Sequence, residues 1–268
     1  IGYATVSANQ LPDPSQARKP INQLRQIAEL VYAELDPWSR QLASATNFSS
    51  LATLMHYPAN LPGITQFPAV AAFGKMLSGV FGGRRRVNFP VADLPPPFPA
   101  CETPPPQGQL RNMARLVGRL GYGIEPDPAT MRSNFVESDQ FLLYRLNEPW
   151  TGDAPDLTVP RAAISLLLSV AAESGQVTAQ HRATIRSTIQ QIFSPSTADA
   201  VRLDMYLTWA ADRPPSTRAL RKRLEALSPP QTEQVALALL ELAGLRDGIA
   251  SDRVTVASNA YRLLGLSE

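Results

Sequence analysis

Proline is the residue that most limits how this chain can fold. Eight of its 25 prolines lie between Gly82 and Gly108, including the triplets Pro95–Pro97 and Pro104–Pro106. Proline fixes φ and lacks a backbone N–H, so it is excluded from helix interiors and central strands. A stretch of this kind favours an extended polyproline II conformation. We therefore predict a proline-rich linker over residues 82–109, with folded regions before and after it.

The region before this linker, residues 1–81, is predicted to be helical after a loosely held arm. Apolar residues recur at helical spacing between Pro20 and Ala45. Pro37 is expected to divide that stretch into two helices, because a proline disrupts the helix that precedes it. Another helix is expected over Pro68–Phe81, ended by the two glycines that follow.

Residues 110–159 are predicted to form a lead-in with one helix and one short strand. The helix is expected over Leu110–Leu120, whose apolar residues share one face. Phe141–Leu146 is short, apolar and aromatic, and is the best strand candidate in the chain. The stretch Gly121–Pro128 between them is rich in turn residues and is expected to be a rigid turn.

The last part of the chain, residues 160–268, is predicted to be an antiparallel helical bundle. Six helices are expected, spanning roughly residues 160–174, 178–194, 197–211, 216–227, 229–245 and 251–264. Helices joined by turns of a few residues must pack as neighbours. The expected core residues are Ile164, Leu167, Leu168, Ile185, Ile189, Leu203, Tyr206, Leu207, Leu224, Leu237, Leu240 and Leu264. The predicted fold class is thus mainly α, with a short strand segment ahead of the bundle.

Composition and motifs limit the functional classes. The formal net charge of +2 does not by itself predict nucleic-acid binding. The single cysteine excludes an intrachain disulfide and fits a reducing cytoplasm. No apolar run approaches the ~18 residues of a membrane span. Hydrolase, P-loop and dinucleotide motifs are absent, and only His56 and His181 offer imidazole chemistry, so we predict a non-enzymatic cytoplasmic protein without a cofactor. Because the chain begins at Ile1 rather than methionine, we expect it to be a fragment.

Two loops of the predicted bundle place acidic residues near a glycine. Glu173 belongs to the loop of residues 171–177, and Asp247 to the loop of residues 244–249, which is followed by Asp252. Two such loops facing each other can offer carboxylate oxygens to one divalent cation. The alternative is a glycine C-cap in each loop with the acid in solvent, and the sequence favours this alternative.

Basic residues form two further groups. Arg84, Arg85 and Arg86 are consecutive, and Arg218, Arg221 and Lys222 share one helical face at i, i+3, i+4 spacing. Both groups have the chemistry to contact phosphates. A run of charges is more often simply solvated, and that is the interpretation we favour here.

Several stretches resemble the TerB family of tellurite-resistance proteins. The stretch Leu168–Gln180 is similar to the first acidic loop of TerB-type domains. Leu242–Gly265, with its ending Ala-Tyr-Arg-Leu-Leu-Gly-Leu over residues 260–266, is similar to the second. Pro214–Leu227 resembles the family's linker helix. Leu120–Asp127 and Phe141–Arg145 resemble the lead-in of multidomain bacterial proteins in which a TerB-N module precedes TerB and a TerB-C module follows it.

The resemblance covers about residues 110–268, and residues 1–81 are interpreted as the end of a TerB-N-like module. It implies a helical cation-binding or docking domain that is linked to tellurite resistance, stress responses and bacterial defence. The chain departs from the family pattern at the metal site. Ser174 replaces the aspartate of the first loop, while Arg246 and Arg253 fall on acidic positions of the second. The resemblance therefore predicts a degenerate metal site.

From the residues and the resemblance together, we predict a non-enzymatic interaction or scaffold module of a bacterial stress-response or anti-phage defence complex. Its expected partners are proteins of the same system, such as an ATPase or a helicase. We do not expect it to bind a membrane. Two alternatives stay open. The first is a divalent-cation sensor that uses Glu173, Asp247 and Asp252, and the second is an accessory nucleic-acid-binding subunit that uses the two basic groups.

Overall fold

The computed structural model describes residues 18–45, 47–58, 61–90, 107–128, 140–149, 156–173, 176–212, 220–244 and 251–266. Over these residues the chain is mainly helical, with ten α-helices, one 3-10 turn and a three-stranded sheet. The buried apolar residues form two separate clusters, one around the sheet and one inside the C-terminal bundle. The predicted fold class, mainly α with a strand segment before the bundle, is confirmed at this level.

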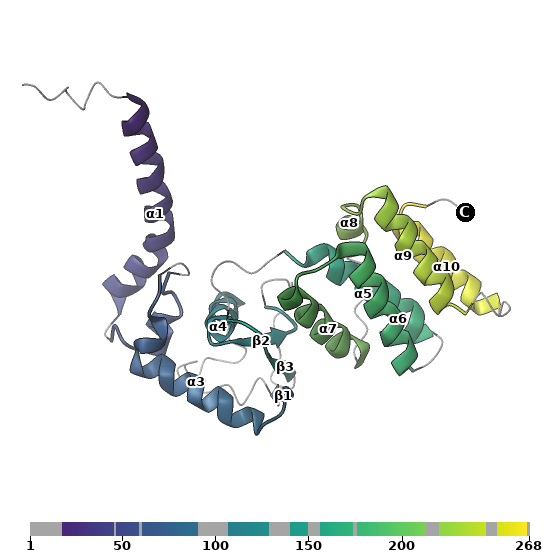
Figure 1. Cartoon of the computed structure of the whole chain (residues 1–268), viewed down its shortest axis with the longest axis horizontal. Helices are drawn as coiled ribbons and strands as arrows, with labels where there is room; N and C mark the ends of the chain where they lie inside the picture. The colour runs from purple at the N-terminus through teal and green to yellow at the C-terminus, as the bar shows by residue number, and fades with distance from the viewer. Residues whose placement is uncertain are drawn as a thin grey trace, which may run out of the picture.

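The first cluster is built by short helices that pack around the sheet. Its helical elements are α2 (Leu51–Leu54), the turn η3 (Ile64–Gln66), α3 (Pro68–Phe81) and α4 (Gln107–Arg119). Helix α3 has the predicted bounds and ends at Gly82, whose φ of 49° lies in the left-handed region that glycine adopts without strain. Buried residues of α3 and α4 pack with Ile124, Phe141 and Leu143 of the sheet in one cluster. Figure 1 shows both helices near the sheet.

The sheet brings together strands from three parts of the sequence. Strand β3 (Gln140–Arg145) is central and pairs antiparallel with β1 (Arg86–Pro90) and β2 (Tyr122–Glu125). Strand β3 was predicted from its apolar composition, but the other two were not. Strand β1 lies inside the predicted linker, and β2 lies in the stretch expected to be a turn. The composition of β1 and β2 does not indicate strands. They become strands because each forms backbone hydrogen bonds with one edge of β3. Residues 91–106 of the predicted linker lie outside the described residues. Residues 107–109 were also predicted as linker, but they belong to α4, which begins three residues earlier than expected.

Strand β3 is buried on both faces. Phe141 and Leu143 belong to the cluster with α3 and α4. Leu142 and Tyr144 point to the opposite face, since successive side chains alternate across a strand, and both are also buried. Helix α7 (Thr197–Asp212) packs against β2 and β3. The sheet is therefore an internal layer between the N-terminal helices and the bundle.

Gly123 is the position of the sheet where only glycine fits. It pairs with Tyr144 in the register of β2 and β3. A Cβ added to Gly123 would lie 2.1 Å from Cζ of Tyr144, whose ring is buried. We expect Gly123→Ala to lower the free energy of unfolding by about 1–3 kcal/mol, the cost typical of overpacking. Urea denaturation would measure it, with Gly79→Ala on α3 as the control because no atom lies within 4 Å of a Cβ added there. Equal stability of the two variants would contradict the close packing of Tyr144.

Helix α1 (Arg18–Ser44) is continuous, so the predicted division at Pro37 is wrong. Proline removes one backbone donor, but the helix is exposed on both sides of this position, where water can solvate the freed carbonyl. Beyond Pro37, Trp38 contacts Tyr57 edge to face with ring centroids 5.4 Å apart. The earlier part of α1 extends away from the rest of the molecule (Figure 1).

The bundle contains six helices close to the predicted ranges. They are α5 (Thr158–Glu173), α6 (Ala179–Phe193), α7, α8 (Arg221–Leu224), α9 (Pro229–Leu242) and α10 (Ser251–Leu263). Helix α5 is buried over most of its length and contacts each of the other five. At the start of α9, the side chain of Gln231 accepts a hydrogen bond from the N–H of Ser228 (2.9 Å), as the capping pattern predicts. Helix α8 is only one turn, shorter than predicted, and residues 213–219 before it lie outside the described part.

Most of the predicted core residues of the bundle are buried or partly buried. Leu237 is the exception, because 57% of its side chain is exposed. The residues of α9 that enter the core are Val235, Ala238, Leu239 and Leu242. Their spacing defines one helical face, and Leu237 lies away from it. The prediction for Leu237 was wrong because residues 235–240 are all apolar. Such a stretch does not indicate which face of the helix packs against the core.

Candidate functional site

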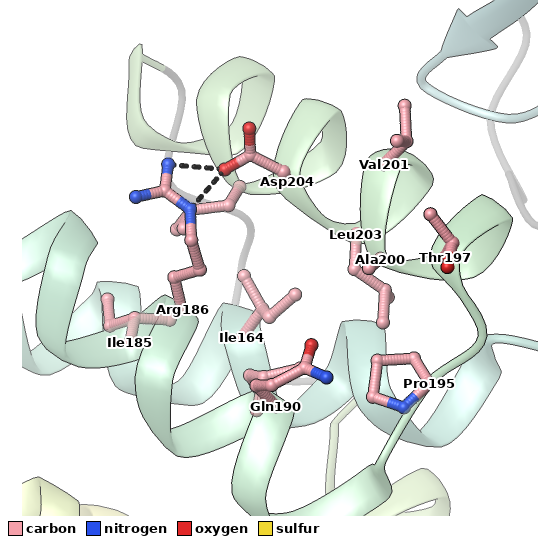
Figure 2. Close-up of a pocket in the computed structure, with 12 residues that line it drawn as sticks. Ile164, Ile185, Arg186, Gln190, Pro195, Thr197, Ala200, Val201, Leu203 and Asp204 are labelled. Carbon is pink, nitrogen blue, oxygen red and sulfur yellow. Dashed lines mark hydrogen bonds and ion pairs between the residues drawn. The ribbon is translucent and has the colours of Figure 1, made fainter. Parts of the chain in front are cut away.

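A groove of about 300 Å³ lies between α6 and α7 over the side of α5 (Figure 2). Its lining residues are Ile164, Ile185, Arg186, Ile189, Gln190, Pro195, Thr197, Ala200, Val201, Leu203, Asp204 and Leu207. The apolar members form the greater part of the surface. We call this the α6–α7 groove.

The sequence explains why the groove is apolar and open. Ile185 and Ile189 are one turn apart on α6, and Leu203 and Leu207 are one turn apart on α7, so each pair faces the core. Ala200 has no side chain beyond Cβ, which leaves room between the two helices. The turn that joins α6 to α7 at Ser194 has a φ of 43°, a left-handed conformation that ends α6 and reverses the chain.

Polar groups stand at the edge of the groove. Arg186 on α6 donates from Nε to Oδ1 of Asp204 on α7 (2.7 Å), and its terminal nitrogen contacts the same oxygen. Figure 2 shows this pair at one end of the groove and Thr197 and Pro195 at the other. The pair is partly exposed, so it orients the helices and contributes little stability. The groove thus combines an apolar floor with polar ends, as peptide-binding grooves do.

A second polar assembly is buried where the sheet meets the bundle. Arg161 of α5 contacts Oε1 of Glu125 through Nη2 (2.5 Å) and Oδ2 of Asp127 through Nη1 (2.9 Å). The second oxygen of Glu125 accepts from the N–H of Asp127 (3.1 Å). The Arg161 guanidinium also lies 5.4 Å from the ring centroid of Tyr206. We call Glu125, Asp127, Arg161 and Tyr206 the Arg161 cluster.

Burial governs the electrostatics of this cluster. The side chain of Glu125 has no exposed surface, and that of Arg161 is 7% exposed. Burial raises the pKa of Glu125 to about 7, and the positive charge of Arg161 opposes the rise. Burial also disfavours the charge of Arg161, but Glu125 and Asp127 outweigh it and hold the pKa of Arg161 above its ordinary value. The cluster therefore links the sheet to the bundle through buried groups, each of which favours the charged form of its partner.

Hydrogen bonds extend from the cluster into the bundle. The hydroxyl of Ser165 donates to the carbonyl of Arg161 (2.8 Å) and lies 2.7 Å from the hydroxyl of Tyr206. Farther along the same junction, Nη1 of Arg86 donates to the hydroxyl of Thr208 (3.2 Å). These contacts fix α5 and α7 against the sheet.

Comparison with protein-family models, curated proteins and solved structures finds no significant match. The TerB resemblance therefore stays a prediction. Among the helices of the described residues, none has the length and apolar character needed to cross a membrane.

The structure describes only part of the predicted metal site. Glu173 is the exposed last residue of α5, and Asp252 is in the first turn of α10. Asp247 lies outside the described residues. Across the described ranges, no group of three His, Cys, Asp or Glu side chains is arranged to hold a metal ion. The cation-sensor alternative stays untested at Asp247.

The predicted basic residues are only partly placed. Arg84, Arg85 and Arg86 are exposed at the start of β1, and Arg86 is engaged with Thr208. Arg221 and Lys222 are exposed on α8, where Nε of Arg221 is 3.8 Å from Oε1 of Glu225. Arg218 lies outside the described part of the chain, so the predicted three-residue face is not assembled from described residues.

Sequence reasoning missed the Arg161 cluster. Arg161 stands just after Pro160 and before a run of apolar residues in α5, and a helix that is apolar on all sides is normally buried. A single charge at the start of such a helix indicates a buried cation, which requires a buried acid elsewhere. The acids that pair with Arg161 are Glu125 and Asp127, on either side of Pro126. Two acids this close together in an otherwise apolar stretch were the signal that could have pointed to them.

Proposed function

We propose that this chain is a non-enzymatic docking module whose α6–α7 groove receives an amphipathic helix of a partner protein. The observation that carries the proposal is the apolar floor of the groove between two helices, bounded by polar ends. Its volume of about 300 Å³ is at the lower end of the ~300–1,000 Å³ range of ligand pockets. It therefore suits a few aliphatic side chains better than a large cofactor.

The chemistry of the lining agrees with this use. Pro195, Ala200 and Val201 are partly exposed and offer area for apolar burial at about 25 cal/mol per Å², whereas Ile164 and Leu203 are already buried. Gln190 and Thr197 at the rim can hydrogen bond to polar groups of the incoming helix. The TerB resemblance adds the expectation that the partner belongs to a bacterial stress-response or defence system, for example as its ATPase.

The test is capture of partner proteins from native lysate by the tagged chain and by matched variants. Val201→Lys places a charge in the groove and Ala200→Phe fills it, so each should reduce a stoichiometric partner roughly tenfold or more, the loss expected when an anchor of about 1.4 kcal/mol is removed. Leu237→Lys on α9 is the control, because it adds the same charge at an exposed leucine outside the groove.

Circular dichroism and thermal melting would confirm that each variant folds. Loss of the same partner from both groove variants, with retention by the α9 control, supports the proposal. A partner retained equally by all four chains would place docking elsewhere. Absence of any stoichiometric partner at low and high salt would count against a docking function.

A further inference from the structure

Helix α1 carries an apolar stripe whose part between residues 22 and 33 is left exposed by the rest of the described chain. Its residues recur at alternating intervals of three and four, the spacing of positions a and d in a coiled coil. They are Ile21, Leu24, Ala28, Val31, Leu35, Trp38 and Leu42. We call them the α1 stripe. Trp38 packs on Tyr57, but every residue from 22 to 33 is exposed, including Leu24 (65%) and Val31 (47%).

A helix of this kind is not stable by itself in water. The exposed part before Pro37 is about five turns long, and none of the other described helices packs along it to offset the cost of ordering its backbone. Within the described residues, α1 packs only through its C-terminal end, near α2. Burying the stripe against another helix would supply the missing stabilisation.

The charges of α1 indicate what that other helix is. Residues 18–26 contain three cations and no acid, namely Arg18, Lys19 and Arg25. Residues 27–36 contain three acids and no cation, namely Glu29, Glu34 and Asp36, the last of which accepts a hydrogen bond from Nε of Arg40 one turn later (3.1 Å). A single helix is stabilised by acids in its first turn and cations in its last, and α1 has neither. A second α1 running in the opposite direction places the basic half of each helix beside the acidic half of the other.

We propose that α1 pairs with α1 of a second copy of this chain as an antiparallel, coiled-coil-like helix pair. The parts of the two stripes before Pro37 form the apolar seam, and Ala28 near its middle allows the two backbones to approach closely. Helices packed in this way lie about 8–10 Å apart, close to the screening length of about 8 Å in physiological salt, so the opposed halves attract, and attract more strongly at low salt. Trp38 anchors each helix to its own molecule, which leaves the segment before Pro37 for the partner copy. This pairing is independent of the α6–α7 groove.

The first test compares two leucines of the same helix by sedimentation equilibrium of the full chain. Leu24 lies in the stripe, whereas Leu30 lies about 120° around the helix from it and is equally exposed (72%). Leu24→Glu should weaken dimerisation by roughly 100-fold or more, because each dimer loses two buried leucines and gains two charges in an apolar seam. Leu30→Glu should leave dimerisation unchanged. A monomeric native chain, or equal effects of both variants, would overturn the proposal.

The second test establishes the direction of pairing at low salt. Lys19→Glu with Arg25→Glu makes both halves of α1 acidic and should weaken the dimer by roughly tenfold, because like charges then face each other. Adding Glu29→Arg and Glu34→Arg reverses the sign of the net charge of each half, although Arg18 and Asp36 keep their charges, and should restore part of the dimerisation in an antiparallel pair. In a parallel pair, halves of like charge face each other in the native chain and in both variants. The dimer would then not be weakened by the first two substitutions and strengthened again by the next two. That result would overturn the antiparallel arrangement.

Discussion

Arg161→Met is expected to lower the free energy of unfolding by about 3–5 kcal/mol at pH 7, the cost of removing one partner from a buried ion pair. The methionine would preserve much of the side-chain volume, so the loss would come from the charges. Glu125 would remain fully buried without its guanidinium partner, and Asp127 would lose a 2.9 Å contact. Urea denaturation followed by circular dichroism would measure the change.

Arg186→Met is the matched control for this measurement. It removes an arginine that also joins two elements through an aspartate, but its side chain is 55% exposed. An exposed pair contributes about 0–1 kcal/mol, so this variant should remain close to the native stability. If the two substitutions had the same effect, the burial of the Arg161 cluster would not be the source of its contribution. The loss from Arg161→Met should also shrink towards pH 5, where the folded chain holds Glu125 protonated.

The stability of the native chain relative to the Glu125→Gln variant is expected to fall by up to about 3 kcal/mol as the pH rises from about 4.5 to about 7. The sign follows from the pKa of Glu125, which burial raises in the folded chain to about 7 from an ordinary value of 4.5. Between these values the unfolded chain releases a proton that the folded chain retains. Raising the pH therefore favours unfolding, and above about pH 7 the difference becomes constant.

Glutamine is a suitable reference because its carbonyl oxygen can still accept from Arg161, while its side chain does not titrate. The measurement is urea denaturation of both chains at several pH values from 4 to 8, with the difference in unfolding free energy plotted against pH. A difference that stays flat, or that favours the native chain more strongly at higher pH, would contradict a raised pKa for Glu125. It would mean that the attraction of Arg161 outweighs burial.

Helices α3 and α9 were predictable because local signals mark their ends. Ser228 and Gln231 cap α9, and the glycines after α3 stop it at the predicted residue. Strand β3 was predictable as well, from its apolar and aromatic run. Such signals depend only on neighbours in sequence, so one sequence is enough to read them.

Strands β1 and β2 and the Arg161 cluster depend on residues far apart in the chain, and local signals do not encode such contacts. Arg86 begins a strand because it pairs opposite Tyr144, and Glu125 is buried because Arg161 reaches it from α5. The α6–α7 groove was also missed, since it depends on how two helices pack around Ala200. Pro37 was misinterpreted because a proline that disrupts a packed helix is tolerated in a solvated one.

The order of strands in the sheet changes where this protein can be divided. Strand β1 is encoded before residues 91–106, yet it completes one edge of β3, which is encoded after them. The high proline content of residues 91–106 would suggest a boundary between modules there. Cutting there would separate a strand from its sheet and leave a row of backbone donors and acceptors on an apolar edge, the feature that promotes intermolecular strand pairing. A truncation point or a recombination joint should therefore fall outside residues 86–145, the span that encodes all three strands of the sheet.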